Sequence, residues 1–273
     1  MRRPLIMLAF LLVTTCAVGP ASQATPMRSA PSPYRALVHR WTSVPIGEEA
    51  AVRSPLYGAP EATAECELPL VWTGDWTDQK NYLSAVSACL DRIWAREFEK
   101  VNVFFTKPRR EFVLERVHDP QCGTMPVAGA EGTYCGATST YYVLVGGDGL
   151  WPWSRAEAAQ VVAHEYGHHV QYLTNITDYR DFALESAKRS AADLLSRRLE
   201  LQAECLSGVA IRAMERTMPP WEQFEGLYSG TLARRWVRDH GRLSTQLLWM
   251  ERGFRSGRPG ACTTWTSLKS EVT

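Results

Sequence analysis

The chain has 273 residues, of which 45% are hydrophobic and 22% are charged. These fractions exclude an intrinsically disordered protein, and the length allows one large domain or two small ones. Lysine and arginine number 30, and aspartate and glutamate number 29. The resulting net charge of +1 argues against a nucleic-acid-binding protein that relies on bulk charge. No apolar run reaches the roughly 18 residues that a membrane-spanning helix needs. We therefore expect a soluble protein with one sizeable core.

The N-terminal residues 1–24 have the pattern of a secretory signal peptide. Arg2 and Arg3 precede the apolar run Leu5–Val13, and Ser22-Gln23-Ala24 offers small residues at a cleavage site. The alternative is a short membrane anchor that is not cut. Lipid attachment at Cys16 is disfavoured, because the preceding Thr14-Thr15 makes a poor lipobox. We expect a secreted protein without a stable membrane span after cleavage.

The cysteines agree with export. Cys16 leaves with the leader, and an even number remains in the mature chain. Cysteines in an oxidising compartment form disulfides, but six of them allow 15 pairings, and buried free thiols are the alternative. The remaining cysteines are Cys66, Cys89, Cys122, Cys135, Cys205 and Cys262.

Residues 25–62 are rich in Pro, Ser and Ala and show little periodicity. This composition favours a loose linker or a pro-like segment. We expect the folded domain to cover residues 63–273 and to begin near Cys66.

The first half of this domain predicts one helix followed by strands. A helix capped by Thr77 or Asp78 and running to about Glu99 has one apolar face. We expect strands at 101–105, 111–117 and 141–145, with a glycine-rich loop over 122–135. The apolar positions of the helix are Leu83, Val86, Leu90 and Ile93.

The second half is helical. Ser154 and Glu157 form a capping box, which predicts a helix from Arg155 to about Leu173. A helical stretch over about 182–214, long enough for one break, ends before Pro219-Pro220, and a last helix covers 243–255. A small sheet followed by helices indicates an α+β domain.

The capped helix carries His164-Glu165-Tyr166-Gly167-His168. Histidines four residues apart lie on the same helical face, so both imidazoles can reach one metal ion. This is the His-Glu-x-x-His signature of metalloproteases, in which the glutamate contacts the water on the metal. Gly167 would let another element or the substrate approach closely. The alternative is a polar helix face with chance spacing.

A catalytic zinc ion needs a third protein ligand. Glu200 and Glu204 lie four residues apart and share a helix face. One of them can bind the metal while the other holds a ligand histidine. Since Arg197 and Arg198 lie nearby, a solvated surface stripe is the alternative.

These motifs resemble those of the bacterial neutral zinc metallopeptidases. The segment His164–Gln171 is similar to that family's metal-binding helix, and Glu200–Cys205 to its second signature, Glu-Leu-Gln-Ala-Asp-Cys. The stretch from Trp249 to Trp265 resembles the family's C-terminal part, and the likeness runs from about Cys66. Glu204 departs from the pattern, because it stands where the family has Asp.

The resemblance implies a zincin-like single domain, with a small sheet N-terminal to a mostly helical part. It implies one catalytic Zn²⁺ held by His164, His168 and Glu200, with Glu204 supporting a ligand. It also implies three disulfide pairs: Cys122–Cys135, Cys205–Cys262 and Cys66–Cys89. The family's substrates would be peptides or proteins.

The expected reaction is hydrolysis of a peptide bond by a zinc-activated water, with Glu165 as the general base. We consider His240 and Tyr142 as donors to the oxyanion, although a surface histidine and a packed tyrosine are the plainer interpretations. His169 is rotated by about 100° from His168 and should not share the metal. It is expected to support the site or to be structural.

The strand at 141–145 precedes the metal helix, and we hypothesise that it forms a sheet edge that pairs with extended peptide. Two other functions remain open. One is a secreted, non-catalytic binding module on a peptidase-like frame, and the other is a zinc hydrolase of a non-peptide cell-wall amide.

Overall fold

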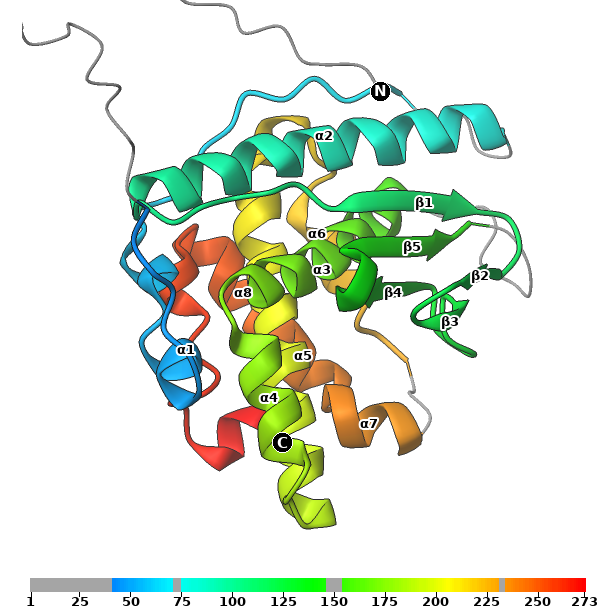
Figure 1. Cartoon of the computed structure of the whole chain (residues 1–273). Helices are drawn as coiled ribbons and strands as arrows, with labels where there is room; N and C mark the ends of the chain where they lie inside the picture. Colours follow the sequence, from blue (N-terminus) through cyan, green and yellow to red (C-terminus); the bar gives the residue numbers. More distant parts are fainter. Residues whose placement is uncertain (1–40, 71–74, 146–153, 231–233) are drawn as a thin grey trace, which may run out of the picture. The chain divides into compact units, whose positions relative to one another are not determined.

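Helix α2 (Trp76–Lys100) lies along the sheet and the central helices in the computed structural model (Figure 1). The structure describes residues 41–70, 75–145, 154–230 and 234–273. The carboxylate of Asp75 accepts the backbone amides of Thr77 and Asp78 at 2.7 and 3.3 Å, so Asp75 caps the helix in place of the expected Thr77 or Asp78.

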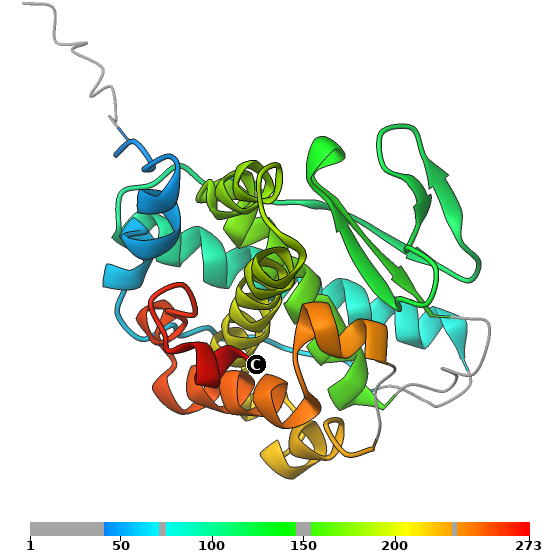
Figure 2. The same cartoon turned by 90° about the horizontal axis from the view of Figure 1, so that it is seen from below.

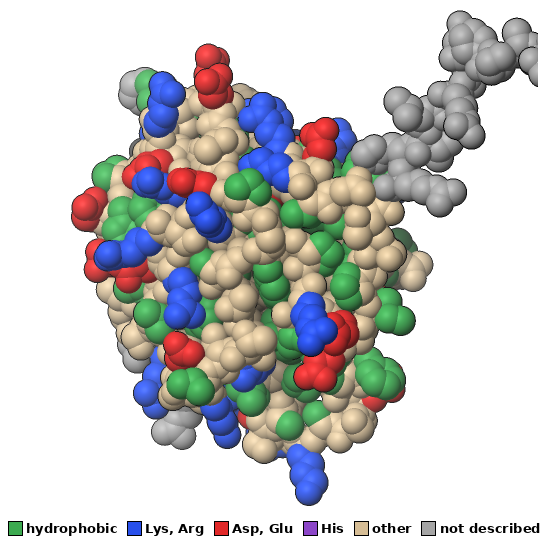
Figure 3. Space-filling view, turned by 90° about the vertical axis from the view of Figure 1, so that its left-hand side faces the viewer, with side chains coloured by type: hydrophobic (Ala, Val, Ile, Leu, Met, Phe, Trp, Pro, Cys, Tyr) green, Lys and Arg blue, Asp and Glu red, His purple; other side chains and the backbone are tan. Residues whose placement is uncertain are grey.

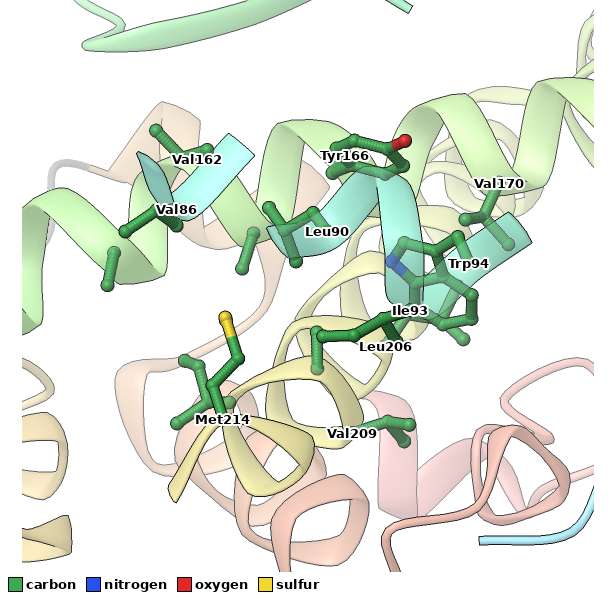
Figure 4. Close-up of a cluster of buried hydrophobic side chains, with 14 of the residues drawn as sticks. Val86, Leu90, Ile93, Trp94, Val162, Tyr166, Val170, Leu206, Val209 and Met214 are labelled. Atoms are coloured by element: carbon green, nitrogen blue, oxygen red, sulfur yellow. The ribbon is translucent and has the colours of Figure 1, made fainter. Parts of the chain in front are cut away.

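The predicted apolar face of α2 is confirmed. Leu83, Val86, Leu90 and Ile93 are all fully buried. Figure 4 shows this face, together with Trp94, packed against side chains of two other helices. These are α3 (Arg155–Leu173) and α5 (Arg189–Ala213). The main hydrophobic core therefore lies between α2, α3 and α5.

The main sheet has the strand order β1–β5–β4. Its strands are β1 (Arg109–Val113), β5 (Thr140–Leu144) and β4 (Gly132–Cys135). β1 pairs with β5 in parallel, and β4 pairs with β5 in antiparallel orientation. The hypothesis that 141–145 forms a free sheet edge is wrong, because β5 is central and both its edges are occupied. The two edge strands of this sheet are β1 and β4.

Three other expectations for this region also need correction. Residues 101–105 form no strand, and the strand expected at 111–117 is instead β1, which begins at Arg109 and ends at Val113. The glycine-rich stretch 122–135 contains β4 and also β3 (Gly123–Met125), which pairs with β2 (Val117–Asp119). Short strands with few apolar residues leave a weak alternation in the sequence.

Asp119 anchors the β2–β3 hairpin. Its carboxylate accepts the hydroxyl protons of Tyr142 at 2.6 Å and of Thr138 at 3.0 Å, and the amides of Gln121 and Cys122 at 2.8 and 2.9 Å. The hydrogen bond from Tyr142, with those from the amides and Thr138, lowers the pKa of Asp119 to about 2. The ionised carboxylate thus ties the hairpin to β5.

The helical part follows the chain order expected from the sequence. α3 has the predicted bounds, and the capping box of Ser154 and Glu157 is formed. The stretch predicted over 182–214 is broken into α4 (Ile176–Leu184) and α5. The remaining helices are α6 (Trp221–Gly226), α7 (Arg234–His240) and α8 (Leu243–Ser256). Short 3₁₀ helices cover Pro55–Gly58, Gly136–Thr138, Glu215–Thr217, Pro259–Ala261 and Lys269–Val272.

Helices α5 and α8 run side by side at very close range (Figure 2). A Cβ atom on Gly253 would overlap the carbonyl oxygen of Cys205, and one on Gly208 would overlap that of Met250. The disulfide Cys205–Cys262, with 5.4 Å between Cα atoms, ties α5 to the segment that follows α8. Glycine is required at these positions because any side chain would separate the helices.

The linker interpretation of residues 25–62 is wrong for residues 41–62. Helix α1 (Glu48–Val52) and the 3₁₀ helix Pro55–Gly58 lie in this segment, and Ala50 and Ala51 are fully buried. The folded unit therefore includes everything described from residue 41 onward, rather than beginning near Cys66. Residues 1–24, for which a signal peptide is predicted, and residues 25–40 of the predicted linker lie outside the described residues.

The three expected disulfides are confirmed. Besides Cys205–Cys262, the pairs are Cys66–Cys89 and Cys122–Cys135, with Cα atoms 5.9 and 6.0 Å apart. On the face shown in Figure 3, acidic and basic side chains are interspersed among apolar ones. Within the described ranges, no helix is both long enough and apolar enough to cross a membrane.

Replacing Gly253 by alanine should destabilise the fold, because the added methyl group would force α8 away from α5. We expect a loss of about 1–3 kcal/mol in the free energy of unfolding. For a domain of this size, that loss lowers the melting temperature by about 2–4 °C per kcal/mol. Thermal denaturation measures it. Gly226→Ala is the matched control, because nothing lies within 4 Å of a Cβ atom there. Equal melting temperatures for the two variants would contradict the close contact.

Candidate metal centre

Two histidines of α3 and one glutamate of α5 converge on one point. The rings of His164 and His168 are 4.8 Å apart between centroids. The carboxylate oxygen Oε2 of Glu200 lies 3.3 Å from Nε2 of His164 and 3.2 Å from Nε2 of His168. All three candidate ligand atoms lie within 4.8 Å of one another. Two imidazole nitrogens and one carboxylate oxygen form a donor set that suits a catalytic zinc ion.

Gly167 brings α5 close enough for this convergence. A Cβ atom at this position would lie 2.9 Å from the carbonyl oxygen of Ala203 and 3.0 Å from its Cα atom. The expectation that Gly167 permits a close approach is therefore confirmed, and the approaching element is α5. Ala203 lies between the two candidate acids Glu200 and Glu204 on α5. Its contact with Gly167 therefore determines how far both carboxylates lie from α3.

Glu204 holds the far side of His164. Its Oε2 atom lies 2.6 Å from Nδ1 of that histidine, and its side chain is almost fully buried. The carboxylate of Glu204 accepts this hydrogen bond, so Nδ1 carries a proton, and Nε2, which faces Glu200, is the nitrogen that a metal ion would bind. The methylene by which Glu exceeds Asp does not prevent this bond.

Gln160 and Tyr228 in turn hold Glu204. The amide of Gln160 donates to both carboxylate oxygens at 3.0 and 3.2 Å, and the hydroxyl of Tyr228 donates to Oε1. Neither residue was predicted from the sequence. For Gln160 a signal existed, because it lies four residues before His164 on the same face of α3. For Tyr228, no local pattern links it to α5.

Glu165 is buried beside these groups. Its side chain packs against β4, where a Cβ atom on Gly132 would lie only 2.5 Å from Oε1. Its other oxygen, Oε2, is buried and has no hydrogen-bond partner among the described residues. Burial raises the pKa of Glu165, although His168 and His164 oppose this shift. An unpartnered buried oxygen next to three metal-ligand atoms suits a bound water molecule.

The charges of the cluster depend on one another. Burial alone would raise the pKa of Glu200, but His240, His168 and His164 hold it well below its ordinary value. Burial alone would lower the pKa of His164, but the carboxylates of Glu200 and Glu204 hold it well above its ordinary value. The carboxylate of Glu200 is therefore ionised and ready to bind a cation.

A cavity of about 490 Å³ opens onto this cluster. One wall is the edge strand β4, and the opposite wall includes Trp236 and His240 of α7. The Nε2 atom of His240 lies 3.4 Å from Oε2 of Glu200, and its ring packs edge-on against Trp236 at 4.9 Å. The structure thus brings His240 to the candidate metal centre.

Tyr142 does not reach this cavity, and its assignment as an oxyanion donor is wrong. It is buried on β5, and its hydroxyl donates to Oδ2 of Asp119 at 2.6 Å. The central position of β5 explains the difference, because its side chains face neighbouring elements rather than the cleft.

His169 has a structural role and contacts none of the three candidate ligands. Its Nε2 atom lies 2.6 Å from the carbonyl oxygen of Thr106, so Nε2 donates and Nδ1 accepts the hydroxyl of Tyr134 at 2.9 Å. Burial lowers its pKa to about 4. The neutral ring ties α3 to β4, and Tyr134 also lines the cavity.

Replacing Gly167 by alanine should separate α5 from α3 and weaken metal binding. We expect zinc affinity to fall by about 10–100-fold, the range found when groups that orient ligands are lost. Alanine favours an isolated helix by about 1 kcal/mol, so a loss must come from the contact with Ala203. Competition with a chelator measures the affinity. Gly58→Ala is the control, because nothing lies near its Cβ position. Unchanged zinc affinity in Gly167→Ala would rule out this spacing role.

Comparisons with known proteins agree with this geometry. The model of the family described as "Putative neutral zinc metallopeptidase" matches residues 73–223, more than half of the chain. The proteins named "Uncharacterized protein YpfJ" from Escherichia coli strains K12 and O6:H1 are each 29% identical over 211 residues, covering 67% of this chain and 70% of the relative. No solved structure matches significantly. The chain therefore belongs to the family described as "Putative neutral zinc metallopeptidase".

Proposed function

We propose that this protein is an exported zinc peptidase that cleaves peptide bonds in extended substrates. The observation that carries the proposal is the meeting of His164, His168 and Glu200 around one point, with the unpartnered oxygen of Glu165 beside it. The family supports the enzyme class, and the order of residues along α3 and α5 supports the assignment of each role.

The residues present fit a zinc ion, because two neutral imidazoles and one carboxylate leave room for a further oxygen ligand. A zinc ion held there polarises a carbonyl group and lowers the pKa of bound water to about 7. His164 and His168 would contribute Nε2, and Glu200 would contribute Oε2. The carboxylate of Glu204 keeps the lone pair of His164 directed at the site.

Glu165 would act as the general base and then as the general acid. Burial raises the pKa of Glu165 above the ordinary value of a carboxyl group. A general base is most effective when its pKa lies near the pH of the reaction. After the tetrahedral intermediate forms, the same side chain returns the proton to the leaving amine. The absence of a side chain at Gly132 lets Glu165 pack this closely against β4, in the cavity that His164, His168 and Glu200 also line.

His240 would donate a hydrogen bond to the oxyanion of the tetrahedral intermediate. Its ring lines the cavity next to Glu200, and its side chain is 27% exposed and so is accessible to substrate. The electrostatic pull of Glu200 raises its pKa against the effect of burial, which favours the protonated, donating form. A donor placed where charge develops stabilises the transition state.

The edge strand β4 would bind the substrate backbone. The amide of Leu144 donates to the carbonyl oxygen of Glu131 at 2.7 Å, and antiparallel pairs alternate between bonded and non-bonded residues. Gly132 and Tyr134 therefore direct their backbone groups away from β5, toward the cavity that both residues line. An extended peptide can add to such an edge as a further strand. This requirement favours a peptide over a non-peptide amide.

Export is part of this proposal. The signal-peptide pattern at residues 1–24 supports it, and the three disulfides are typical of proteins that fold in an oxidising compartment. Peptides or proteins outside the cytoplasm would then be the substrates.

Replacing Glu165 by glutamine should abolish cleavage without releasing zinc. We expect kcat to fall by about 10²–10⁴-fold, because the amide cannot accept the proton. The measurement is a peptide-library digest of both proteins, with zinc content determined in parallel. Glu225→Gln, on the exposed surface of α6, is the control. A wild-type protein that holds zinc and cleaves no peptide would contradict the peptidase and leave the cell-wall amide hydrolase. A protein without zinc would leave the binding module.

Replacing His240 by alanine should lower kcat by about 10²–10³-fold while KM and zinc affinity change little, since the lost hydrogen bond forms only in the transition state. Steady-state kinetics on a peptide found in the digest give both constants. A rise in KM with constant kcat would instead assign His240 to ground-state binding.

A further inference from the structure

His168 has a different support from His164. Its Nδ1 atom lies 2.9 Å from Oε1 of Gln171, three residues later on α3. An amide, unlike a carboxylate, can either donate or accept, so this contact alone leaves open which nitrogen of His168 carries the proton. The orientation of the Gln171 amide decides it.

The second contacts of Gln171 settle its orientation. Its Nε2 atom lies 2.7 Å from the carbonyl oxygen of Leu199 and 3.1 Å from Oε1 of Gln202. A backbone carbonyl only accepts hydrogen bonds, so the NH₂ group of Gln171 faces Leu199. Its oxygen therefore faces His168, and Nδ1 of His168 must be the donor. Nε2, which lies 3.2 Å from Oε2 of Glu200, is the nitrogen left to bind the metal.

Gln202 is oriented in the same way by groups from distant parts of the chain. The indole nitrogen of Trp265, which only donates, lies 3.1 Å from Oε1 of Gln202. The NH₂ group of Gln202 donates to the carbonyl oxygen of Cys262 at 3.0 Å and to the hydroxyl of Tyr57 at 2.7 Å. The Tyr57 hydroxyl donates in turn to the carbonyl oxygen of Ala51 at 2.7 Å. The donor and acceptor roles in this series of hydrogen bonds are therefore fixed at every step.

Both glutamines are fully buried, so water does not compete for these bonds. A buried amide that turned over would face a carbonyl oxygen with its own oxygen and leave two donors unpaired, at a cost of about 1–3 kcal/mol for each unsatisfied group. The amide orientations are thus held by more than one contact each.

We propose that Gln171 and Gln202 are positioning residues that hold His168 with its proton on Nδ1 and its Nε2 lone pair free for the metal. The proposal rests on the proposed function insofar as His168 binds zinc. The two histidines thus donate to different acceptors. His164 donates to the carboxylate of Glu204, and His168 donates to the amide of Gln171, which Gln202 orients in turn.

Gln171→Met tests this assignment, because it keeps the side-chain length and removes the acceptor. The expected result is a 10–100-fold loss of zinc affinity, measured by chelator competition. In the metal-free protein labelled with ¹⁵N-histidine, Nδ1 of His168 should carry a proton in wild type and should lose it in part in Gln171→Met. His168→Gln assigns the signal. Gln202→Met should cause a smaller loss, because Leu199 still orients Gln171.

Gln171→Glu is the conservative variant and decides the case if Gln171→Met does not fold. A carboxylate also accepts from Nδ1, so His168 should keep its proton there. The second carboxylate oxygen cannot donate to Leu199 or Gln202, so zinc affinity should lie between those of wild type and Gln171→Met. Gln79→Met removes a buried amide of α2 and controls for the loss of a buried polar group. Its zinc affinity should match wild type.

Two results would overturn the proposal: wild-type zinc affinity with an unchanged His168 spectrum in Gln171→Met, or a proton on Nε2 of His168 in Gln171→Glu. Failure of the proposed function looks different. A wild-type protein that shows the expected His168 tautomer and binds no zinc would refute the metal site and leave the hydrogen-bond relay intact.

Discussion

The site depends on the close contact between α3 and α5 at Gly167 and Ala203. Two histidines on one helix can hold only part of a metal's coordination sphere, so the third ligand must come from another element at short range. The missing side chain of Gly167 lets the backbone of α5 supply Glu200 and Glu204 from adjacent turns. The same helix contacts α8 through Gly208 and Gly253, so α5 is held closely on two sides. The position of α5 is thus determined by contacts with the backbone of its neighbours at these glycines.

The polar interior around the site follows from this close packing. Once α5 lies against α3, the polar groups between the two helices lose access to water and must bond to one another. Glu204 satisfies this requirement with His164, Gln160 and Tyr228. A buried carboxylate also brings negative charge, which strengthens its hydrogen bond to a ligand histidine. A neutral amide at the second histidine avoids a further buried charge near Glu165 and Glu200, where repulsion among acids would be greatest.

Local signals predicted the elements that carry the chemistry. The capping box at Ser154 and the four-residue spacing of His164 and His168 depend only on neighbours in sequence, and the bounds of α3 and the convergence of its histidines agree with them. The central position of β5 could not be predicted, because its parallel pairing with β1 joins residues about 30 apart and leaves no local mark. The segment 41–62 was misinterpreted for a similar reason, since alanines such as Ala50 are buried by partners distant in sequence.

The residues that orient the ligand histidines could be predicted from the sequence only in part. Gln171 shares a helix with His168, so its spacing is a usable signal, whereas the orientation of its amide is set through Gln202 by Trp265 near the C-terminus and Tyr57 near the N-terminus. This dependence gives the two ends of the described chain a part in ordering a central histidine. It also explains why residues 41–62 must fold onto the domain: without Tyr57, the Gln202 amide would lose one of its two acceptors.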